Sequence, residues 1–495
     1  MKPLDAVVVG AGPSGLAASL ALSGWRPHAK PGCRVDDPDL MRRLQRHLAS
    51  QPSGLIDAAA MVSLSVGLRG RSNNPAALLF DALYHVGAEH GHPQPSCLDV
   101  RVASAPLSHL IVDPAPPGGS WHRMHEATRT LSPGQWMELP GFRLEDYMVS
   151  AGYATRAAAR TAAAARQPRS LVAGYYEAAA THFNISKAYR KARVIKVERS
   201  TDAGEGLSFS DPVWTVTLDD GGPPHRTHAL ILAIGTQGSP RQLKIEGELR
   251  DFVFHRCDDG LVQMRTVLVV GAGLAAADCV VHHLSRGRSV VHVFRGDALA
   301  TKIGSKFSEA TAMRMYPEYH LLARAMTTEL VSEDGDPRAY APLLGGRYRP
   351  EANGHLRAIH SNGTCTVEVM HSARRLAAYS VSAVSILIGS KPKFDFLPRD
   401  VLLELEAAGP PADTLHGVKA THPVFFNVNP NTAEVHAVPT MYALGPLRGD
   451  NFVRFAIYDG YSVANALVTR ASQRIRAARQ VIERGSCSTA SDTPI

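Results

Sequence analysis

Two glycine-rich turns, each between an apolar strand and an apolar helix, predict an α/β fold with two dinucleotide-binding, Rossmann-like domains. The first segment, DAVVVGAGPSGLAASLAL, covers residues 5–22, and the second, TVLVVGAGLAAADCVVHHL, covers residues 266–284. Each contains a Gly-x-Gly turn with a small residue three positions further on. This internal repeat in a chain of 495 residues indicates a multidomain protein, because domains average ~150 residues.

The composition, 45% hydrophobic and 20% charged, is typical of a globular protein. The uncharged run over residues 6–22 is shorter than the ~20 apolar residues of a membrane span, and its glycines interrupt it. No signal-peptide pattern precedes this run, so we predict a cytoplasmic protein. The six cysteines form no CxxC pair, which predicts a reducing compartment and neither a metal site nor a redox disulfide.

The net charge of +8 comes partly from arginines near the C-terminus. They are Arg470, Arg474, Arg476, Arg479 and Arg484. We interpret them as the solvated face of a helix, with weak binding of an anionic partner as the alternative. Nucleic-acid binding is not predicted, because aromatic residues are not interleaved with these charges.

In the first turn, three glycines have separate tasks. Gly10 permits the tight turn, Gly12 lets a pyrophosphate approach the backbone, and Gly15 lets the helix pack on the strand. Pro13 and Ser14 begin the helix, whose free N–H groups and dipole favour phosphate. The pattern predicts a nucleotide at residues 10–15, with a ligand-free packing turn as the alternative.

In such domains the second strand ends in an acid that binds the adenosine ribose, about 20 residues after the turn. Here the strand SHLIVD ends at Asp113, which requires residues 23–107 to be an insertion with structure of its own. Asp36 and Asp37 have the usual spacing, but their context, KPGCRVDDPD, resembles a turn without a strand. With Asp113 as the ribose-binding acid, the nucleotide at the first turn would be FAD. PGGSW follows Asp113, and we assign Gly119 and Trp121 within it to this predicted FAD site.

The second turn contains Gly271 and Gly273 and replaces the third glycine with Ala276. The strand that follows, SVVHVFRG, leads to Arg295 and not to an acid. An arginine there suits the 2′-phosphate of NADPH, whereas an acid would suit the ribose hydroxyl of NADH. We therefore predict NADPH at this turn, with a solvent-facing charge as the alternative for Arg295. Less favoured candidates are Arg286 and Arg288.

Two further stretches fit a flavin site. ALILAIGTQGSP, residues 229–240, predicts a buried strand that leads to Gly235, where the chain would cross beneath the flavin. MYALGPLRGDNFVRFA, residues 441–456, supplies Gly445 and Asp450 ahead of a helix that starts near Phe455. We predict that Asp450 meets the ribityl or phosphate region of the flavin; an Asx turn or a helix cap is the alternative.

Shorter patterns predict helices over residues 74–84 and 174–184 and strands over residues 194–198, 213–218 and 229–235. A basic helix from Arg470 and a polar tail end the sequence. We assign three regions: a discontinuous FAD-binding domain, 1–265 and 396–470; an NADPH-binding domain, 266–395; and the helix and tail, 471–495.

The motifs GAGPSG, PGGSW, AIGTQGSP, GAGLAA and ILIGSKPKFDFLP follow the order found in flavin-containing monooxygenases, which the chain resembles over most of its length outside the insertion. Longer runs resemble the oxidative stress-induced growth inhibitor family: GRSNNPAALLFDAL (70–83), LSPGQWMELP (131–140), MYPEYH (315–320) and GPLRGDNFVRF (445–455). The resemblance implies an FAD- and NADPH-dependent, monooxygenase-like flavoprotein with a role in growth regulation, cell death and cytokinesis. It also suggests association with the midbody.

The monooxygenase signature F-x-G-x-x-x-H is altered in this chain. His255 is in place, and we take it as the candidate catalytic residue near the nicotinamide, but Leu249 and Asp251 stand where Phe and Gly belong. These changes keep two alternatives open: a regulatory interaction flavoprotein with little turnover, and an uncoupled NADPH oxidase that releases peroxide. The sequence does not identify the substrate, for which a protein is one candidate.

Overall fold

The computed structural model describes residues 2–72, 74–88, 94–200, 214–258, 265–307, 309–327, 347–370, 374–409, 414–415, 418–419 and 425–488. The chain forms two compact units. Unit 1 comprises Met1–Met124, Arg129–Thr236 and Pro392–Ile495, and unit 2 comprises His125–Thr128 and Gln237–Lys391.

A parallel five-stranded sheet forms the centre of unit 1, in the order β24-β11-β1-β4-β7. Its strands are Met441–Ala443 (β24), Leu230–Leu232 (β11), Ala6–Val9 (β1), His109–Asp113 (β4) and Tyr189–Lys191 (β7). Ala6 and Val8 of β1 belong to one hydrophobic core, and Val7 and Val9 belong to another on the opposite face. The continuous apolar run of β1 is therefore explained by burial on both faces, as in other parallel sheets.

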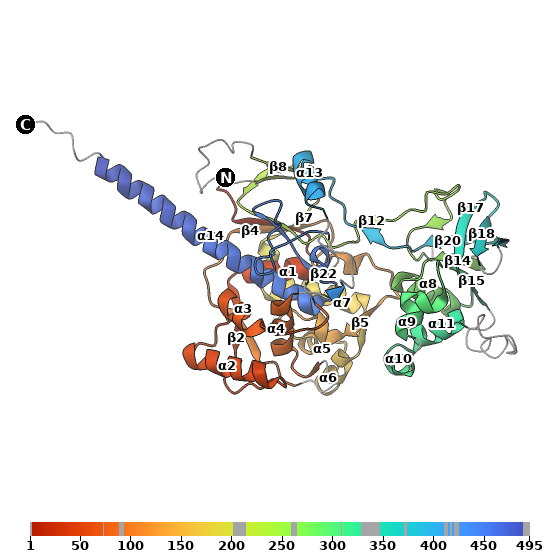
Figure 1. Ribbon diagram of the computed structural model, residues 1–495, viewed down its shortest axis with the longest axis horizontal. Helices are drawn as coiled ribbons and strands as arrows, with labels where there is room; N and C mark the ends of the chain where they lie inside the picture. Colours follow the sequence, from red (N-terminus) through yellow and green to blue (C-terminus); the bar gives the residue numbers. More distant parts are fainter. Residues whose placement is uncertain are drawn as a thin grey trace, which may run out of the picture. The chain divides into compact units, whose positions relative to one another are not determined.

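Helices α1 (Pro13–Leu22) and α14 (Val453–Ser488) lie side by side against this sheet (Figure 1). Gly460 permits their close approach, because a Cβ there would come within 2.5 Å of the backbone of Ala17. The helix predicted near Phe455 and the basic helix predicted from Arg470 are one continuous helix. Arg470 pairs with Glu434 and Arg474 pairs with Asp5, so part of the basic stretch is tied to unit 1. The predicted tail beyond residue 488 lies outside the described residues.

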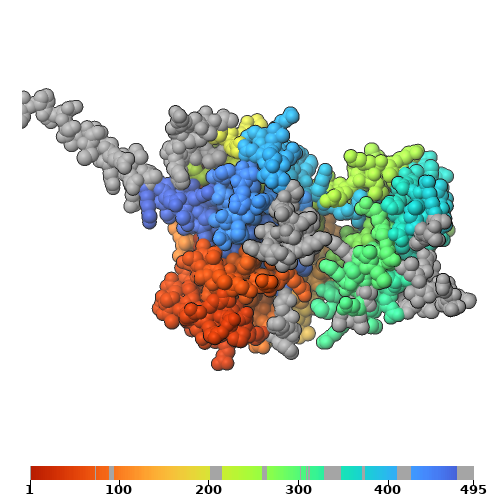
Figure 2. Space-filling model, in the orientation of Figure 1, coloured from red at the N-terminus to blue at the C-terminus, as the bar shows by residue number. Residues whose placement is uncertain are grey.

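The insertion between α1 and β4 has structure of its own. Trp25–Ala29 (β2) and Leu98–Val102 (β3) form an antiparallel pair, and three helices lie between them: Pro38–Ser50 (α2), Ala58–Ser65 (α3) and Pro75–Tyr84 (α4). Asn74 caps α4, which matches the helix predicted over residues 74–84. Phe80 and Leu83 join the core of α1 and α14. Figure 2 shows the described residues of this segment, in red to orange, packed together at the lower left.

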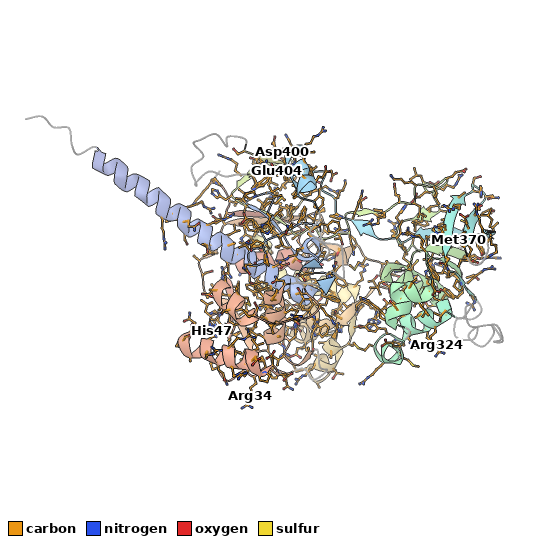
Figure 3. All side chains as sticks on the ribbon, in the orientation of Figure 1. Arg34, His47, Arg324, Met370, Asp400 and Glu404 are labelled. Carbon is orange, nitrogen blue, oxygen red and sulfur yellow. The ribbon has the colours of Figure 1, made fainter. Side chains whose placement is uncertain are left out.

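An antiparallel meander of unit 1 consists of Val194–Arg199 (β8), Trp214–Leu218 (β9) and His225–Thr227 (β10). Two of these strands match predictions, although residue 213 lies outside the described residues. Arg199 donates to Asp400 and Glu404 of α13 (Arg399–Ala408), two residues labelled in Figure 3. The helix predicted over 174–184 is found as Arg169–His182 (α7), which begins five residues earlier, directly after Pro168, and ends two residues earlier.

Other segments of unit 1 complete its periphery: Arg129–Pro133 (β5), Leu144–Ser150 (α5), Arg156–Ala164 (α6) and Arg166–Pro168 (β6). No helix in the described part of the chain is both long and apolar enough to cross a membrane.

Unit 2 repeats the plan of unit 1. Its parallel sheet has the order β13-β20-β14-β15-β16, with strands Val253–Phe254 (β13), Ala383–Ile386 (β20), Thr266–Val270 (β14), Ser289–Val293 (β15) and Tyr348–Glu351 (β16). Helix α8 (Leu274–Ser285) follows β14. A second antiparallel meander contains Gly354–Ile359 (β17), Thr364–Met370 (β18) and Arg374–Ser380 (β19). Two mixed α/β units of this kind are the predicted fold class.

The borders of unit 2 differ from the domain limits assigned from sequence. The described residues 237–258 and 265 belong to unit 2, together with the short segment His125–Thr128, although all of them were predicted to lie in the first domain. The reason is local: β13 has two residues, too few for a periodic signal, yet it pairs with β20 at the edge of the sheet.

Candidate functional site

The first glycine turn connects β1 to α1. Gly10 has φ of 108°, and a Cβ there would lie 2.4 Å from the carbonyl oxygen of Ala233, the residue directly after the neighbouring strand β11. A Cβ at Gly15 would lie 1.9 Å from the Gly10 oxygen, so both positions require glycine. Gly12 is the N-cap of α1, and no side chain caps this end of the helix, where Pro13 and Ser14 begin it. The free N–H groups of α1 are therefore available to an anion.

Asp113 closes the first turn. Its Oδ2 accepts from the backbone N–H of Ala11 at 2.9 Å, and its Oδ1 accepts from the N–H of Ala115 at 2.8 Å. Asp113 is 7% exposed, and it stands at the end of β4, which pairs with β1 in parallel. By contrast, Asp37 is exposed and caps α2 through the N–H groups of Asp39 and Leu40. The structure thus brings Asp113, and not the rival acids, to the glycine turn.

The loop after Asp113 packs directly on the same turn. The N–H of Gly118 donates to the carbonyl of Ala11 at 2.8 Å. A Cβ at Gly119, where φ is 58°, would lie 3.0 Å from Gly12 Cα, which accounts for a glycine there. Trp121 is half-buried, and its carbonyl accepts from Arg169 at 3.4 Å. Gly119 therefore lies at the turn, and Trp121 lies two residues further on.

Gly445 lies against the start of α1. A Cβ on Gly445 would come within 2.4 Å of Ser14 Oγ, and its N–H donates to Asp459 Oδ2 at 2.8 Å. Arg448 Nη1 contacts Asp459 Oδ1 at 2.8 Å, and both side chains are at least 95% buried. Burial raises the pKa of Asp459, while the guanidinium of Arg448 opposes this rise. This buried pair, which sequence reasoning missed, fixes the loop that contains Gly445.

Asp450 is buried and contacts the insertion. Its Oδ1 accepts from Ser72 Oγ at 2.6 Å, a contact between residues 378 positions apart. Burial raises the pKa of Asp450, while Arg448 and the bond from Ser72 oppose this rise. Asn74, two residues after Ser72, has a buried Nδ2 without a hydrogen-bond partner among the described residues. Sequence reasoning missed the roles of Ser72 and Asn74, although both lie in the family-like run 70–83.

Gly235 follows β11, beside β1 in the sheet. Its φ is 63°, and a Cβ there would meet nothing within 4 Å, so its conformation, and not crowding by described atoms, accounts for the glycine. Gly10 packs on the carbonyl of Ala233, two residues earlier. The chain segment after β11 therefore passes the first turn, and the crossing of Gly235 beneath a flavin stays a prediction.

The second glycine turn has the same local geometry. A Cβ at Gly271 would lie 2.3 Å from the carbonyl oxygen of Leu387, just as Gly10 packs on Ala233. Gly273 is the N-cap of α8, without a side-chain cap, and a Cβ there would meet nothing within 4 Å. Ala276 is fully buried, so its methyl group fills the place of a third glycine. Arg295, two residues beyond β15, is exposed.

A buried histidine supports the second turn. His292 of β15 is fully buried; its Nε2 lies 2.6 Å from the Gly271 carbonyl oxygen and its Nδ1 lies 2.8 Å from the hydroxyl of Tyr348. A neutral imidazole satisfies both contacts by donating from Nε2 and accepting at Nδ1. No sequence signal distinguishes His292 from the other 21 of the 22 histidines, because its two partners, Gly271 and Tyr348, come from two other segments of the chain.

Acidification is expected to destabilise unit 2 through His292. Burial lowers the pKa of His292 from 6.5 to about 4, and the bond to Gly271 opposes this shift. Between these values the unfolded chain binds more protons than the folded chain, so stability falls as the pH falls. The linkage relation gives a loss of about 2 kcal/mol between pH 7 and pH 5. Urea unfolding followed by circular dichroism measures it. The non-titrating variant His292→Gln should show a flatter dependence; an unchanged dependence would contradict the assignment.

His255 lies in unit 2, where its Nε2 contacts Glu248 Oε1 at 2.9 Å. Glu248 is buried and also accepts from the N–H groups of Leu243 and Lys244. Burial raises the pKa of Glu248, but the bonds from His255 and the backbone outweigh it and hold this pKa below its usual value. His255 is thus part of a structural network, and its role near a nicotinamide stays a prediction.

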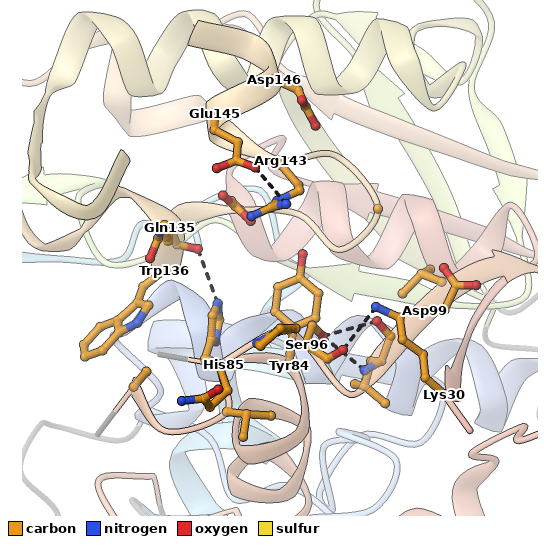
Figure 4. Close-up of a pocket in the computed structure, with 18 of the residues that line it drawn as sticks. Lys30, Tyr84, His85, Ser96, Asp99, Gln135, Trp136, Arg143, Glu145 and Asp146 are labelled. Atoms are coloured by element: carbon orange, nitrogen blue, oxygen red, sulfur yellow. Dashed lines mark hydrogen bonds and ion pairs between the residues drawn. The ribbon is translucent and has the colours of Figure 1, made fainter. Parts of the chain in front are cut away.

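A cavity of about 550 Å³ lies in unit 1, lined by the insertion and by residues that follow β5 (Figure 4). Glu138 accepts from the N–H of Leu144 at 2.9 Å, and burial raises its pKa to about 8, so its carboxyl group is largely neutral at pH 7. His85 lies between Asp81, at 2.8 Å, and the carbonyl of Gln135, at 3.3 Å. An uncharged acid and an imidazole in the lining of one cavity make it a candidate site for a small polar ligand. Sequence reasoning did not identify it.

No protein-family model matches the chain. Oxidative stress-induced growth inhibitor 1 of Mus musculus is 32% identical over 496 residues, covering 96% of this chain and 97% of that protein. Oxidative stress-induced growth inhibitor 2 of Homo sapiens is 30% identical, covering 94% of each chain.

Two solved structures share the fold. Bacillithiol disulfide reductase from Staphylococcus aureus matches 95% of this chain and 99% of its own, with a TM-score of 0.55 and 14% identity. Ornithine N-hydroxylase of Kutzneria sp. 744, solved with reduced FAD, NADP⁺ and L-ornithine, matches 95% of this chain and all of its own, with a TM-score of 0.54 and 14% identity. The predicted FAD/NAD(P)-binding flavoprotein fold is confirmed. With the full-length similarity to curated relatives, the chain belongs to the oxidative stress-induced growth inhibitor family.

Proposed function

We propose that the protein is an FAD- and NADPH-dependent oxidoreductase of the monooxygenase type. The observation that carries this proposal is the contact of Asp113 with the N–H of Ala11, which supports Asp113 as the proposed ribose-binding acid beside an uncapped helix N-terminus. Unit 1 would then be the FAD-binding domain and unit 2 the NADPH-binding domain. The residues present fit both groups, because Gly12 and Gly273 leave open space where a side chain would otherwise stand.

In unit 1 the N–H groups at the start of α1, with Pro13 and Ser14, would bind the pyrophosphate of FAD, and Asp113 would accept from the adenosine ribose. Gly119 would keep the backbone close to the dinucleotide, while Trp121, Gly235, Gly445 and Asp450 are the proposed neighbours of the flavin half. In unit 2 Gly271, Gly273 and Ala276 would bind the second pyrophosphate.

When bound, NADPH supplies hydride and FAD passes reducing equivalents to O₂. The protein's own residues bind both nucleotides, orient them and exclude water. His255 is the proposed residue beside the nicotinamide, although its bond to Glu248 leaves only Nδ1 for a second contact.

Arg295→Ala is expected to raise the KM for NADPH about tenfold or more while leaving the KM for NADH unchanged. The reason is the loss of a charge-assisted contact with the 2′-phosphate, worth about 1.5–3 kcal/mol. Steady-state oxidation of both nucleotides measures the ratio. Arg286→Ala is the matched control, because Arg286 was a less favoured candidate and lies 3.4 Å from Glu126. An unchanged NADPH-to-NADH preference in Arg295→Ala would remove Arg295 from the site.

The proposed activity is tested on the purified full-length protein. Its visible spectrum reports flavin, and NADPH consumption and peroxide release are then followed with and without candidate protein substrates. NADPH consumption coupled to an oxygenated product supports the monooxygenase. A colourless protein that does not react with NADPH would overturn it.

A regulatory flavoprotein with little turnover is the second candidate. It is favoured by Leu249 and Asp251 at two signature positions and by the engagement of His255 with Glu248. Retained flavin with negligible NADPH consumption would support this reading, and rapid peroxide release without substrate would indicate an uncoupled oxidase. In each case we propose that the protein regulates growth, cell death or cytokinesis, in the cytoplasm and at the midbody. The growth inhibitor names of its relatives support the first of these roles.

A further inference from the structure

Unit 2 contains a cluster of cysteine and histidine side chains at the C-terminal half of α8. Cys279 and His283 are four residues apart and so project from one face of the helix, and both are fully buried. Cys257, from the segment after β13, meets them: its Sγ lies 4.0 Å from His283 Nε2. The second glycine turn is at the N-terminal end of α8, whereas the cluster lies toward its C-terminal end, so the two are separate.

The ligand atoms of Cys257, Cys279 and His283 all lie within 4.8 Å of one another. A second set, His125, Cys257 and His282, meets the same criterion and shares Cys257. In a tetrahedral zinc site, Zn–S bonds of about 2.3 Å and Zn–N bonds of about 2.0 Å separate neighbouring ligand atoms by about 3.5 Å. The Cys257 Sγ–His283 Nε2 distance of 4.0 Å would have to shorten by about 0.5 Å to reach this geometry.

We propose that Cys257, Cys279 and His283 bind one Zn²⁺, with His125 as the fourth ligand. Two thiolates and imidazole nitrogens are the ligand set that zinc prefers, and hard cations such as Mg²⁺ would be excluded. Binding exchanges the two thiol protons for the cation, so two protons are released to solvent and the site is close to neutral. Without a cation, the hydrogen bond with Cys279 and burial raise the pKa of Cys257 to about 12, which keeps the thiol protonated.

The contact of Arg288 with His283 disfavours the binding of zinc to this histidine. Its Nη1 lies 2.9 Å from His283 Nδ1, and arginine can only donate, so Nδ1 accepts and the ring proton lies on Nε2, facing Cys257. Zinc at Nε2 moves this proton to Nδ1, where histidine ligands normally donate to an acceptor. Arg288, which is half-buried, must then turn away. A residue at position 288 that accepts a hydrogen bond should therefore strengthen the site.

The test uses the full-length protein, purified without a metal-affinity step, stripped with a chelator and titrated with ZnCl₂ and CoCl₂. We expect about one equivalent of bound zinc, and a Co²⁺ spectrum with the sulfur-to-metal and d–d bands of a tetrahedral thiolate site. Cys257→Ser and Cys279→Ser should lose both. Cys365→Ser is the matched control, because Cys365 is as fully buried in unit 2 as Cys279 but lies outside both candidate metal sets.

Arg288→Gln keeps every ligand and provides a readout even where a cysteine variant fails to fold. Its amide oxygen can accept from Nδ1–H, so zinc affinity should rise about tenfold or more, whereas Arg288→Lys should bring no such gain. Wild-type protein that binds no zinc would overturn the proposal. Zinc retained by Cys257→Ser, or a Cys257–Cys279 disulfide in protein isolated under reducing conditions, would overturn it as well.

Discussion

Purified Asp113→Ala protein is expected to lose most of its flavin absorbance and to unfold at lower denaturant concentration. The carboxylate accepts from two buried N–H groups, those of Ala11 and Ala115, and alanine leaves both without a partner. Each unsatisfied buried N–H costs about 1–3 kcal/mol, so the turn that would hold FAD loses its fixed shape together with its ribose acceptor. Flavin released by heat and measured against protein concentration gives the occupancy.

Asp37→Ala is the matched control for this experiment. Asp37 has the sequence spacing that Asp113 lacks, but it is exposed and only caps α2. Loss of that cap should cost about 1 kcal/mol and leave flavin occupancy unchanged. Full occupancy in Asp113→Ala, or loss of flavin in Asp37→Ala, would show that the turn is not the nucleotide site.

Asp459→Asn is expected to destabilise unit 1 by about 3–5 kcal/mol. Asn removes the charge that balances Arg448, whose side chain is 5% exposed, and an uncompensated buried guanidinium is costly. Urea unfolding monitored by tryptophan fluorescence measures the loss, since Trp25, Trp121, Trp136 and Trp214 all belong to unit 1.

The double variant Arg448→Met with Asp459→Leu separates two explanations. Replacing both charges with apolar groups should recover part of the stability, because no guanidinium is then buried without Asp459, although Asp450 loses the nearby positive charge of Arg448. If the double variant is as unstable as the sum of the single changes, the two side chains act independently and the pair is not the reason for the loss.

The strands and turns of both glycine motifs were predictable, because a β-strand, a Gly-x-Gly turn and an apolar helix are adjacent in sequence. Asp113 was also predictable, since a strand ending in an acid and followed by PGGSW is a local pattern even when an insertion separates it from Gly10. The helix predicted over residues 74–84 follows the same rule. The main strands, turns and helices of both units were therefore predictable from residues that are adjacent in sequence.

What the sequence could not predict depends on contacts between distant segments. Ser72 reaches Asp450, Tyr348 reaches His292, and Cys257 reaches α8, and no spacing rule joins these positions. The candidate zinc ligands come from the segment after β13 and from α8, so no CxxC motif in the sequence pointed to them. The start of unit 2 was missed for a related reason, because two-residue strands such as β13 carry no periodicity.

The bond from Ser72 to Asp450 means that the insertion cannot be trimmed freely during evolution. A relative that lost the segment around residue 72 would leave the carboxylate at position 450 buried without its neutral donor. Natural sequences should therefore covary at these two positions: chains with a shortened insertion should carry either an uncharged residue at 450 or a replacement hydroxyl from elsewhere.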